Sequence, residues 1–257
     1  MEQKLSKKTR MESDLIGSRE VPENALYGVQ TLRGIENFRI SKFHLSEYPL
    51  FIQALAVTKM GAAIANRELD LLTEEQADAI LKACKEILEG KHCEQFPVDM
   101  IQGGAGTTTN MNANEVIANR ALELMGHQRG EYQYCSPNDH VNRSQSTNDA
   151  YPTAIHIGLY YTHLKLLKHF GILIESFRKK GRAFAHIIKV GRTQLEDAVP
   201  MTLGQTFNGF ASILEDEVKN LDFAAQDFLT VNMGATAIGT GITAEPEYAE
   251  KCIDALR

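Results

Sequence analysis

The sequence predicts a mainly α fold, in which a small N-terminal α-rich domain is followed by an incomplete central bundle of long helices. Three observations predict it. Apolar residues recur at the three- and four-residue spacing of a helix face through most of the chain. Hydroxyl and amide residues stand where several of these runs begin, as at helix N-caps. Two of the runs, residues 152–190 and 203–228, are longer than most helices of globular domains.

The first elements in chain order are short. Residues 12–48 combine short apolar stretches with turn residues, so we expect a loop with one short helix or hairpin. Residues 49–69 have helical apolar spacing. A second helix starts at a capping box of Thr73 and Gln76 and stops at Gly90. We expect these two helices to pack as an antiparallel pair.

A glycine-rich stretch, residues 102–112, leads into the next helix. We expect Asn112 to cap this helix, Glu115 to complete a capping box, and Gly126 to end the helix.

A polar run, residues 136–152, comes next, and it also ends in a helix start. Asn148 or Asp149 can serve as the N-cap, and we expect Pro152 within the first turn, where its missing N–H costs nothing.

The second half of the chain predicts long helices. In the run 152–190, Gly171 or Gly181 can break or bend the helix, and Gly191 ends it. A polar connection, residues 191–202, follows.

Another capping box, Thr202 with Gln205, opens a helix to Phe228. A last helix begins near Pro246 and has no stop signal at Arg257. The long helices carry more apolar surface than they can cover among themselves, so we expect the chain to end before its bundle is complete.

These elements predict three parts of the chain. Residues 1–11 are expected to be a disordered leader. Residues 12–145 are expected to form the N-terminal domain, and residues 146–257 the truncated central helical bundle.

Composition excludes several classes of protein. With 257 residues and a net charge of −6, the chain lacks the basic surface that sequence-independent nucleic-acid binding needs. No apolar run could span a bilayer, and no apolar segment follows the basic N-terminus as in a signal peptide. The four cysteines lack disulfide or CxxC spacing, so we expect a cytoplasmic protein with reduced thiols. The histidine spacings predict no metal site.

Three polar stretches suggest the chemistry: residues 102–112, 136–149 and 191–202. Each carries hydroxyls or amides beside a long helix, where free N–H groups and the helix dipole favour anions. Together they predict a site for a small, multiply anionic substrate. Hydrogen bonds from such donors stabilise the dianionic aci-carboxylate that forms when a proton is removed next to a carboxylate.

Other interpretations of these residues remain open. Ser146, Thr147 and Asn148 are also typical of a helix cap without any ligand. The glycine-rich stretch lacks the Gly-Lys-Ser/Thr of a P-loop. Arg19 and Arg33 are candidates to meet an anion, although surface arginine is the common alternative.

At these residues the sequence resembles the aspartase/fumarase superfamily, as the N-terminal portion of such a protein. The resemblance covers nearly all of the chain from Met11 on. It rests on several ordered stretches: REVPENALYGVQTLRGIENF, FPVDMIQGGAGTTTNMNANEV, SPNDHVNRSQSTNDAYPTA, KVGRTQLEDAVPMTLGQ and NMGATAIGTG.

Four positions favour the aspartase branch of this superfamily over its fumarases. Fumarases of this class tend to have aspartate where His140 stands, serine at Thr147, histidine at Gln194 and glycine at Ala235. The Gln194 position is only suggestive, because some aspartases have histidine there.

The resemblance implies an activity: reversible elimination of ammonia from L-aspartate to give fumarate, with no required cofactor. It implies that a dicarboxylate or amino-acid substrate is bound by Thr107, Ser146, Thr147, Asn148 and Thr193, with Gln194 beside them and Arg33 and Lys189 as electrostatic supports. It also implies a mostly α homotetramer, in which each active site is built from three chains.

One part of the family pattern is absent. The family's base is a serine in a mobile glycine-serine-serine loop, which these 257 residues lack. We therefore expect the base serine to lie beyond Arg257. Two alternatives stay open: a class II fumarase acting on malate, and a non-catalytic helical fragment. We expect the chain alone to be inactive and prone to aggregation.

Overall fold

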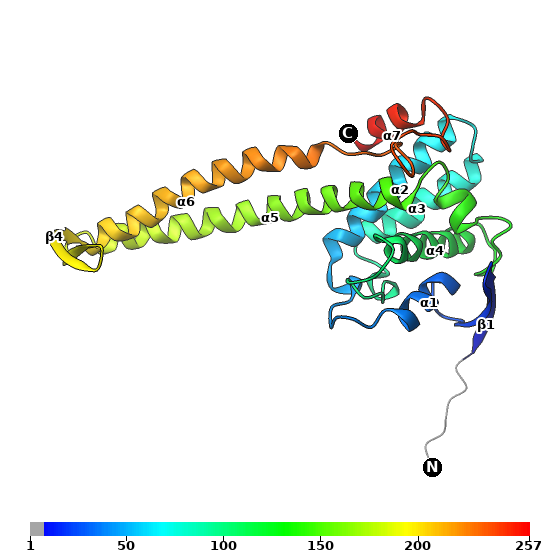
Figure 1. The fold of residues 1–257 in the computed structure, drawn as a ribbon, viewed down its shortest axis with the longest axis horizontal. Coiled ribbons are helices and arrows are strands. Elements are labelled where there is room, and N and C mark those ends of the chain that lie inside the picture. The colour runs from blue at the N-terminus through cyan, green and yellow to red at the C-terminus, as the bar shows by residue number, and fades with distance from the viewer. Residues whose placement is uncertain (1–7) are drawn as a thin grey trace, which may run out of the picture. The chain divides into compact units, whose positions relative to one another are not determined.

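The computed structural model describes residues 8–257, which form two compact units. The first unit runs to Gly158 and resumes from Val231 to Arg257, and the second comprises Leu159–Thr230. Helices make up most of each unit (Figure 1). The predicted mainly α fold class is therefore confirmed.

A β-hairpin begins the first unit. Strand β1 (Thr9–Asp14) pairs antiparallel with β2 (Gly17–Pro22), and helix α1 (Val29–Asn37) follows. The guanidinium of Arg10 donates to the carbonyls of Pro22, Ala25 and Tyr27 at 3.0, 2.7 and 2.8 Å. One side chain thus fixes the loop between the hairpin and α1.

The expected disordered leader, residues 1–11, has too long a range. Residues 1–7 lie outside the described residues, but Thr9, Arg10 and Met11 belong to β1. Their backbone is held by antiparallel pairing with β2, which the sequence pattern did not reveal.

The predicted helix pair forms the core of the first unit. Helices α2 (Pro49–Glu68) and α3 (Glu74–Leu88) pack their apolar faces together. The capping box is confirmed, because Thr73 and Gln76 each accept the other's backbone N–H at 3.2 Å. Short 3₁₀ turns, η1 (Leu45–Glu47) and η2 (Cys93–Gln95), lie on either side of the pair in the sequence.

Helix α4 (Thr107–Leu124) starts five residues before the expected cap. Asn112 is fully buried inside the helix, where its amide nitrogen donates to the Gln95 carbonyl at 3.0 Å. The Asn112–Glu115 capping box is therefore wrong. The helix instead follows Gly106, whose φ of 90° only glycine adopts readily.

Glu115 caps a different helix. Its buried carboxylate accepts the backbone N–H groups of Gly28, Gln30 and Thr31 at 2.8, 2.8 and 3.0 Å. Glu12 accepts the next N–H group, that of Val29, at 3.0 Å. These two buried carboxylates lie at the positive end of the α1 dipole and satisfy donors that the helix itself leaves free.

The polar run expected at residues 136–152 is ordered. It contains a π-helical turn, η3 (Pro137–Val141), and then the start of α5 (Thr147–Ala183). Pro152 is the sixth residue of α5 and not part of its first turn, so that expectation is wrong.

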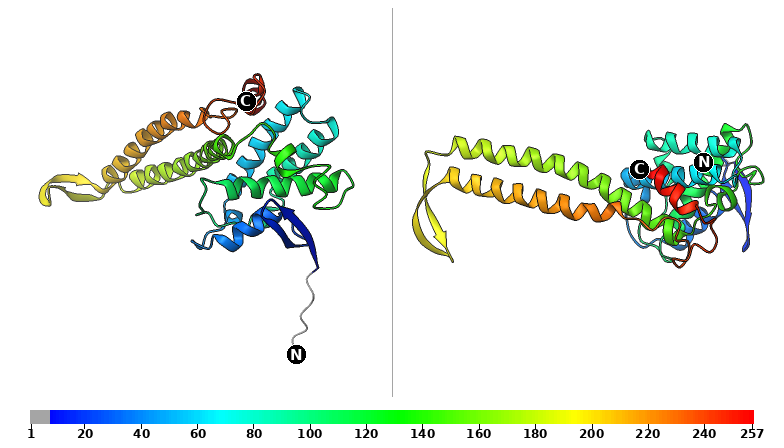
Figure 2. Two further views of the ribbon diagram at one scale, coloured as in Figure 1. Left: turned by 45° about the vertical axis from the view of Figure 1, so that its right-hand side comes forward. Right: turned by 90° about the horizontal axis from the view of Figure 1, so that it is seen from above.

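The second unit contains the residues of α5 from Leu159 on, helix α6 (Leu203–Ala225) and a 3₁₀ turn, η4 (Gln226–Leu229). Helices α5 and α6 run side by side in Figures 1 and 2. They are joined by an ion pair of Arg178 with Glu215 at 2.7 Å and by contact of the Phe177 and Phe207 rings.

Two expectations about this region are wrong. Helix α5 is not broken at Gly171 or Gly181, and it ends at Ala183, not at Gly191. The expected polar connection, residues 191–202, lies in a second hairpin of β3 (Ile188–Thr193) and β4 (Glu196–Thr202). The capping box of Thr202 with Gln205 is confirmed at the start of α6.

The last segment of the chain returns to the first unit. Helix α7 (Tyr248–Leu256) packs on α2 so closely that a Cβ at Gly61 would lie 2.8 Å from the Leu256 side chain. Tyr248 and Cys252 are fully buried there. The two compact units are not divided at residues 145/146, and the expected domain bounds stay a prediction. No helix among residues 8–257 has the length and apolar character needed to cross a membrane.

We predict that Glu115→Gln lowers the free energy of unfolding by about 3 kcal/mol, because an amide cannot accept all three backbone N–H groups. Thermal and urea unfolding of the full chain measure this change. Glu250→Gln, on the exposed face of α7, is the matched control. Equal stability of the two variants would contradict the capping role of Glu115.

Candidate active site

Two helix starts meet in the first unit, and they carry four of the predicted site residues. Asn110, one turn into α4, donates its amide N–H to the Thr147 hydroxyl at the start of α5 at 3.0 Å. A Cβ at Gly106 would lie 2.4 Å from the Tyr151 ring. The structure therefore brings Thr107 together with Ser146, Thr147 and Asn148.

Thr107 is exposed at the first position of α4. Its hydroxyl donates to the Gly104 carbonyl at 2.7 Å. Gly104, Ala105 and Gly106 all have positive φ angles, of 83°, 51° and 90°. The loop before Thr107 is thus a tight left-handed turn, which presents the helix start to solvent.

Ser146, and not Asn148 or Asp149, caps α5. The Ser146 hydroxyl accepts the Asn148 N–H at 3.2 Å, and Asp149 accepts the Ser146 N–H at 2.9 Å. Pro152 cannot bond the Asn148 carbonyl, four residues back, because it has no N–H. The amide of Asn232 donates to that carbonyl instead, at 3.1 Å.

Asp149 also holds a distant segment over this helix start. Its fully buried carboxylate accepts the N–H groups of Gly234 and Thr236 at 3.1 and 2.9 Å. The Asn148 amide donates to the Ala237 carbonyl at 2.8 Å. The small-residue stretch NMGATAIGTG is therefore fixed beside Asn148.

A buried lysine lies behind the two helix starts. The Lys59 ammonium on α2 donates to the side-chain oxygens of Asn110, Asn142 and Gln145 at 2.7, 2.9 and 2.8 Å. Lys59 is only 1% exposed, and burial lowers its pKa to about 7, although the negative charge of Asp149 acts in the opposite direction. Lys59 is not among the site residues predicted from the sequence.

Sequence reasoning could have found Lys59. It follows Ala56 by three residues and precedes Ala63 by four, so it lies within the apolar stripe that predicts α2. A charged residue on a buried face needs partners. The three amides that supply them come from distant parts of the chain.

Arg33 lies in α1 and is already paired. Its guanidinium contacts both carboxylate oxygens of Asp14 at 2.8 and 2.9 Å, and donates to the Gly17 carbonyl at 2.8 Å. This contact lowers the pKa of Asp14. The pair ties the first hairpin to α1, while the predicted role of Arg33 toward an anion stays a prediction.

The other predicted residues belong to the second unit. Lys189 and Thr193 are exposed on β3, and Gln194 begins the turn of the hairpin. Gln194 and Leu195 have positive φ angles of 46° and 75°, a conformation that suits a tight two-residue hairpin turn. The hairpin thus belongs to the second unit, and Thr107 belongs to the first.

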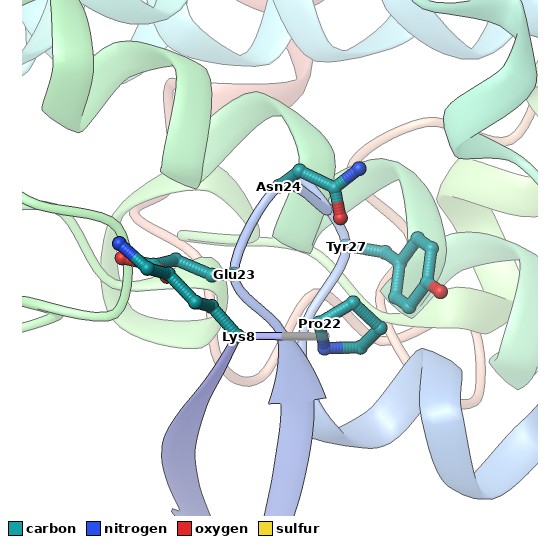
Figure 3. Close-up of a pocket in the computed structure, with 5 residues that line it drawn as sticks. All are labelled: Lys8, Pro22, Glu23, Asn24 and Tyr27. Carbon is teal, nitrogen blue, oxygen red and sulfur yellow. The ribbon is translucent and has the colours of Figure 1, made fainter. Parts of the chain in front are cut away.

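Two cavities of the first unit lie near the first hairpin and α1. The pocket in Figure 3, about 650 Å³, lies beside the end of the first hairpin and is lined by Lys8, Pro22, Glu23, Asn24 and Tyr27. Another pocket, of about 500 Å³, is lined by residues that include Arg33 and Thr108. Among residues 8–257, no cluster of three histidine, cysteine or acidic side chains is arranged to hold a metal ion.

Comparison with known protein families shows which family this chain belongs to. A family model described as "Lyase" matches residues 17–257. The chain belongs to this lyase family. The membership confirms the resemblance drawn from the sequence motifs, whose residues form the helix starts of α4 and α5.

Individual relatives agree with the lyase family. The chain is 53% identical over 253 residues to "Aspartate ammonia-lyase" of Escherichia coli (strain K12), covering 98% of this chain and 53% of that protein. It is 56% identical over 248 residues to "Aspartate ammonia-lyase" of Pseudomonas canavaninivorans, covering 96% of this chain and 52% of that protein. The chain thus spans about half the length of these relatives.

Solved lyase structures have the same fold. The "fumarate lyase:delta crystallin from Brucella melitensis bound to cobalt" superposes with a TM-score of 0.92 at 51% identity, over 97% of this chain and 54% of that one. The class II fumarase of Schistosoma mansoni gives 0.89 at 36% identity, over 97% and 52% of the two chains.

We predict that the stability of this lyase chain depends on pH through Lys59. The ordinary lysine pKa is about 10.4, and the folded value is about 7. Between these pH values the unfolded chain binds more protons at Lys59 than the folded chain, so the free energy of unfolding rises with pH. Below pH 7 both states are charged, and this contribution is constant.

The melting temperature of the wild type minus that of Lys59→Met, measured from pH 6 to pH 9, checks this expectation. The difference should grow in favour of the wild type above pH 7. Lys82→Met, on the exposed side of α3, should give no such trend. A difference that stays constant across this range would show that the pKa of Lys59 is not lowered.

Proposed function

We propose that this chain is part of an aspartate ammonia-lyase, which reversibly eliminates ammonia from L-aspartate to give fumarate. The observation that carries the proposal is the match of nearly the whole chain to proteins of that name at 53% and 56% identity. The chemistry of the site supports it, because uncharged donors at two helix starts suit a small carboxylate.

In the proposed mechanism, the donors stabilise charge that develops during the reaction. Removing the proton next to a carboxylate of aspartate gives an aci-carboxylate with two negative oxygens. Hydrogen bonds from the hydroxyls of Ser146 and Thr147 and from the Asn148 amide become stronger as that charge grows. The Thr107 hydroxyl joins them when it turns from the Gly104 carbonyl to the substrate. No cofactor takes part in this proposal.

The base belongs to the part of the relatives' length that this chain does not span. We expect it to be the serine of the family's mobile loop, which removes the proton before ammonia leaves. A positioned base typically contributes 10²–10⁴-fold. The residues of this chain therefore bind and stabilise, and the rate depends on a residue outside it.

Assembly completes the proposed site. In a homotetramer with each site built from three chains, Thr193 and Gln194 of one copy can join the Thr107 group of another. The second unit supports assembly, because large apolar side chains are exposed along its helices, among them Ile172 (59%), Ile213 (62%) and Phe223 (82%). Apolar surface of this extent commonly marks an interface. Arg33 and Lys189 add positive charge in the proposed tetramer.

Two alternatives are tested with the main proposal. A class II fumarase that acts on malate is supported by the structural match to such an enzyme. A non-catalytic helical fragment is the second alternative.

The test uses a protein that spans the full length of the relatives. Release of fumarate, followed by its ultraviolet absorbance, is measured with L-aspartate and with malate. We expect turnover of aspartate and little of malate. Preference for malate would favour the fumarase, whereas a stable, active oligomer of the 257-residue chain would exclude the inert fragment.

We predict that Thr107→Ala and Asn148→Ala in this protein each lower kcat/KM about 100-fold, because each removes a hydrogen bond to the developing charge. Their melting temperatures should change little by comparison. Steady-state kinetics and thermal unfolding of each variant provide the two measurements.

A cap that does not touch substrate provides the control. Thr73→Ala removes the α3 capping box and should lower stability by about 1 kcal/mol without lowering kcat/KM. If Thr107→Ala or Asn148→Ala behaved like Thr73→Ala, its role would be capping alone.

A further inference from the structure

Lys59 is a buried cation that the proposed mechanism does not use. Its ammonium is enclosed by α2, α4 and the 142–145 loop, and it has three hydrogen-bond partners: Asn110, Asn142 and Gln145. In its charged form, which the folded chain holds below about pH 7, Lys59 is only a donor. The oxygen of each amide must therefore face Lys59, and the N–H groups must point away.

The orientation of Asn110 determines what reaches Thr147. The Asn110 oxygen accepts from Lys59 at 2.7 Å, so its nitrogen is the atom that faces the Thr147 hydroxyl at 3.0 Å. The second Asn110 N–H donates to the Asn142 oxygen at 3.1 Å. The amide oxygen and both amide N–H groups of Asn110 are therefore engaged. Turning the amide by 180° would point its N–H groups at the ammonium, which has only N–H groups itself.

The orientation of Asn110 also determines which partner the Thr147 hydroxyl hydrogen can have. A hydroxyl that accepts an N–H on its oxygen keeps its own hydrogen for another partner. Among residues 8–257, no hydrogen bond uses the Thr147 hydroxyl as a donor. That hydrogen is left for a group outside the chain, at a helix start that favours anions.

We infer that Lys59 is a positioning residue that, acting through Asn110, makes the Thr147 hydroxyl a hydrogen-bond donor toward an anionic substrate. This inference rests on the proposed function, in which Thr147 binds a carboxylate. It goes further by assigning a role to a residue that does not touch the substrate. In this arrangement Lys59 donates to the Asn110 oxygen, the Asn110 nitrogen donates to the Thr147 hydroxyl, and that hydroxyl donates to the substrate.

Asn110→Asp is the decisive variant. The introduced carboxylate keeps the contact with Lys59 as an ion pair but has no N–H for Thr147, so the Thr147 hydroxyl donates to this carboxylate and not to the substrate. In the protein that spans the relatives' full length, assayed near pH 6 where Lys59 is charged, we expect kcat/KM for aspartate to fall about 10- to 100-fold. The carboxylate also loses the hydrogen bond to the Asn142 oxygen, so the melting temperature is measured beside the kinetics to show that the variant stays folded.

A double-mutant cycle separates positioning from a general structural effect. Once Thr147→Val has removed the hydroxyl, Asn110→Asp or Lys59→Met should lower kcat/KM by less than about threefold further. Strongly non-additive effects are expected of residues that act through one another. Thr58→Val, a buried change next to Lys59 on α2, should leave the kinetics unchanged.

Each outcome decides the inference. Full activity of Asn110→Asp, or additive effects in the cycle, would overturn it. If Lys59→Met does not fold, the Asn110→Asp and Thr147→Val pair still completes a cycle.

If the wild type converts neither aspartate nor malate, the proposed function fails, and a separate measurement then tests the orientation. Neutron diffraction of the wild type would show whether the deuterium of the Thr147 hydroxyl points away from Asn110, as expected. A deuterium that points toward Asn110 would overturn the inference.

Discussion

A charged group buried away from water must find partners, and the first unit is arranged around one such group, Lys59. An unpaired ammonium in this core would be very unfavourable. Three side-chain oxygens meet it, from Asn110, Asn142 and Gln145. Helix α4 and the loop before α5 are therefore held against α2 by hydrogen bonds as well as by apolar packing.

Buried carboxylates serve the same purpose at other helix starts. Glu115 takes three N–H groups at the start of α1. Asp149 takes one N–H near the start of α5 and two from the 234–236 segment. In both places a carboxylate at a helix N-terminus organises the protein itself. The uncharged hydroxyl and amide side chains of Thr107, Thr147 and Asn148 lie near these helix starts.

This division of roles explains why residue type alone is a poor guide to function. Thr107, Thr147 and Asn148 resemble ordinary caps in composition, and Asn148 does contact the backbone of Ala237. What distinguishes the region is that the starts of α4 and α5 lie together, with Asn110 bonded both to Thr147 and to the buried Lys59. The family membership gives that arrangement a chemical context.

The sequence by itself determined the elements whose signals are local. The α2 and α3 helices and the capping boxes at Thr73 and Thr202 follow from apolar spacing and from contacts three residues apart. The motif stretches determined the lyase family as well. Only the tertiary structure decided that Glu115 caps α1, that residues 188–202 form a hairpin and that Lys59 supports Thr147. Lys59 lies 51, 83 and 86 residues from its partners, and pairing at such separations leaves no periodic pattern, because it depends on how the helices pack.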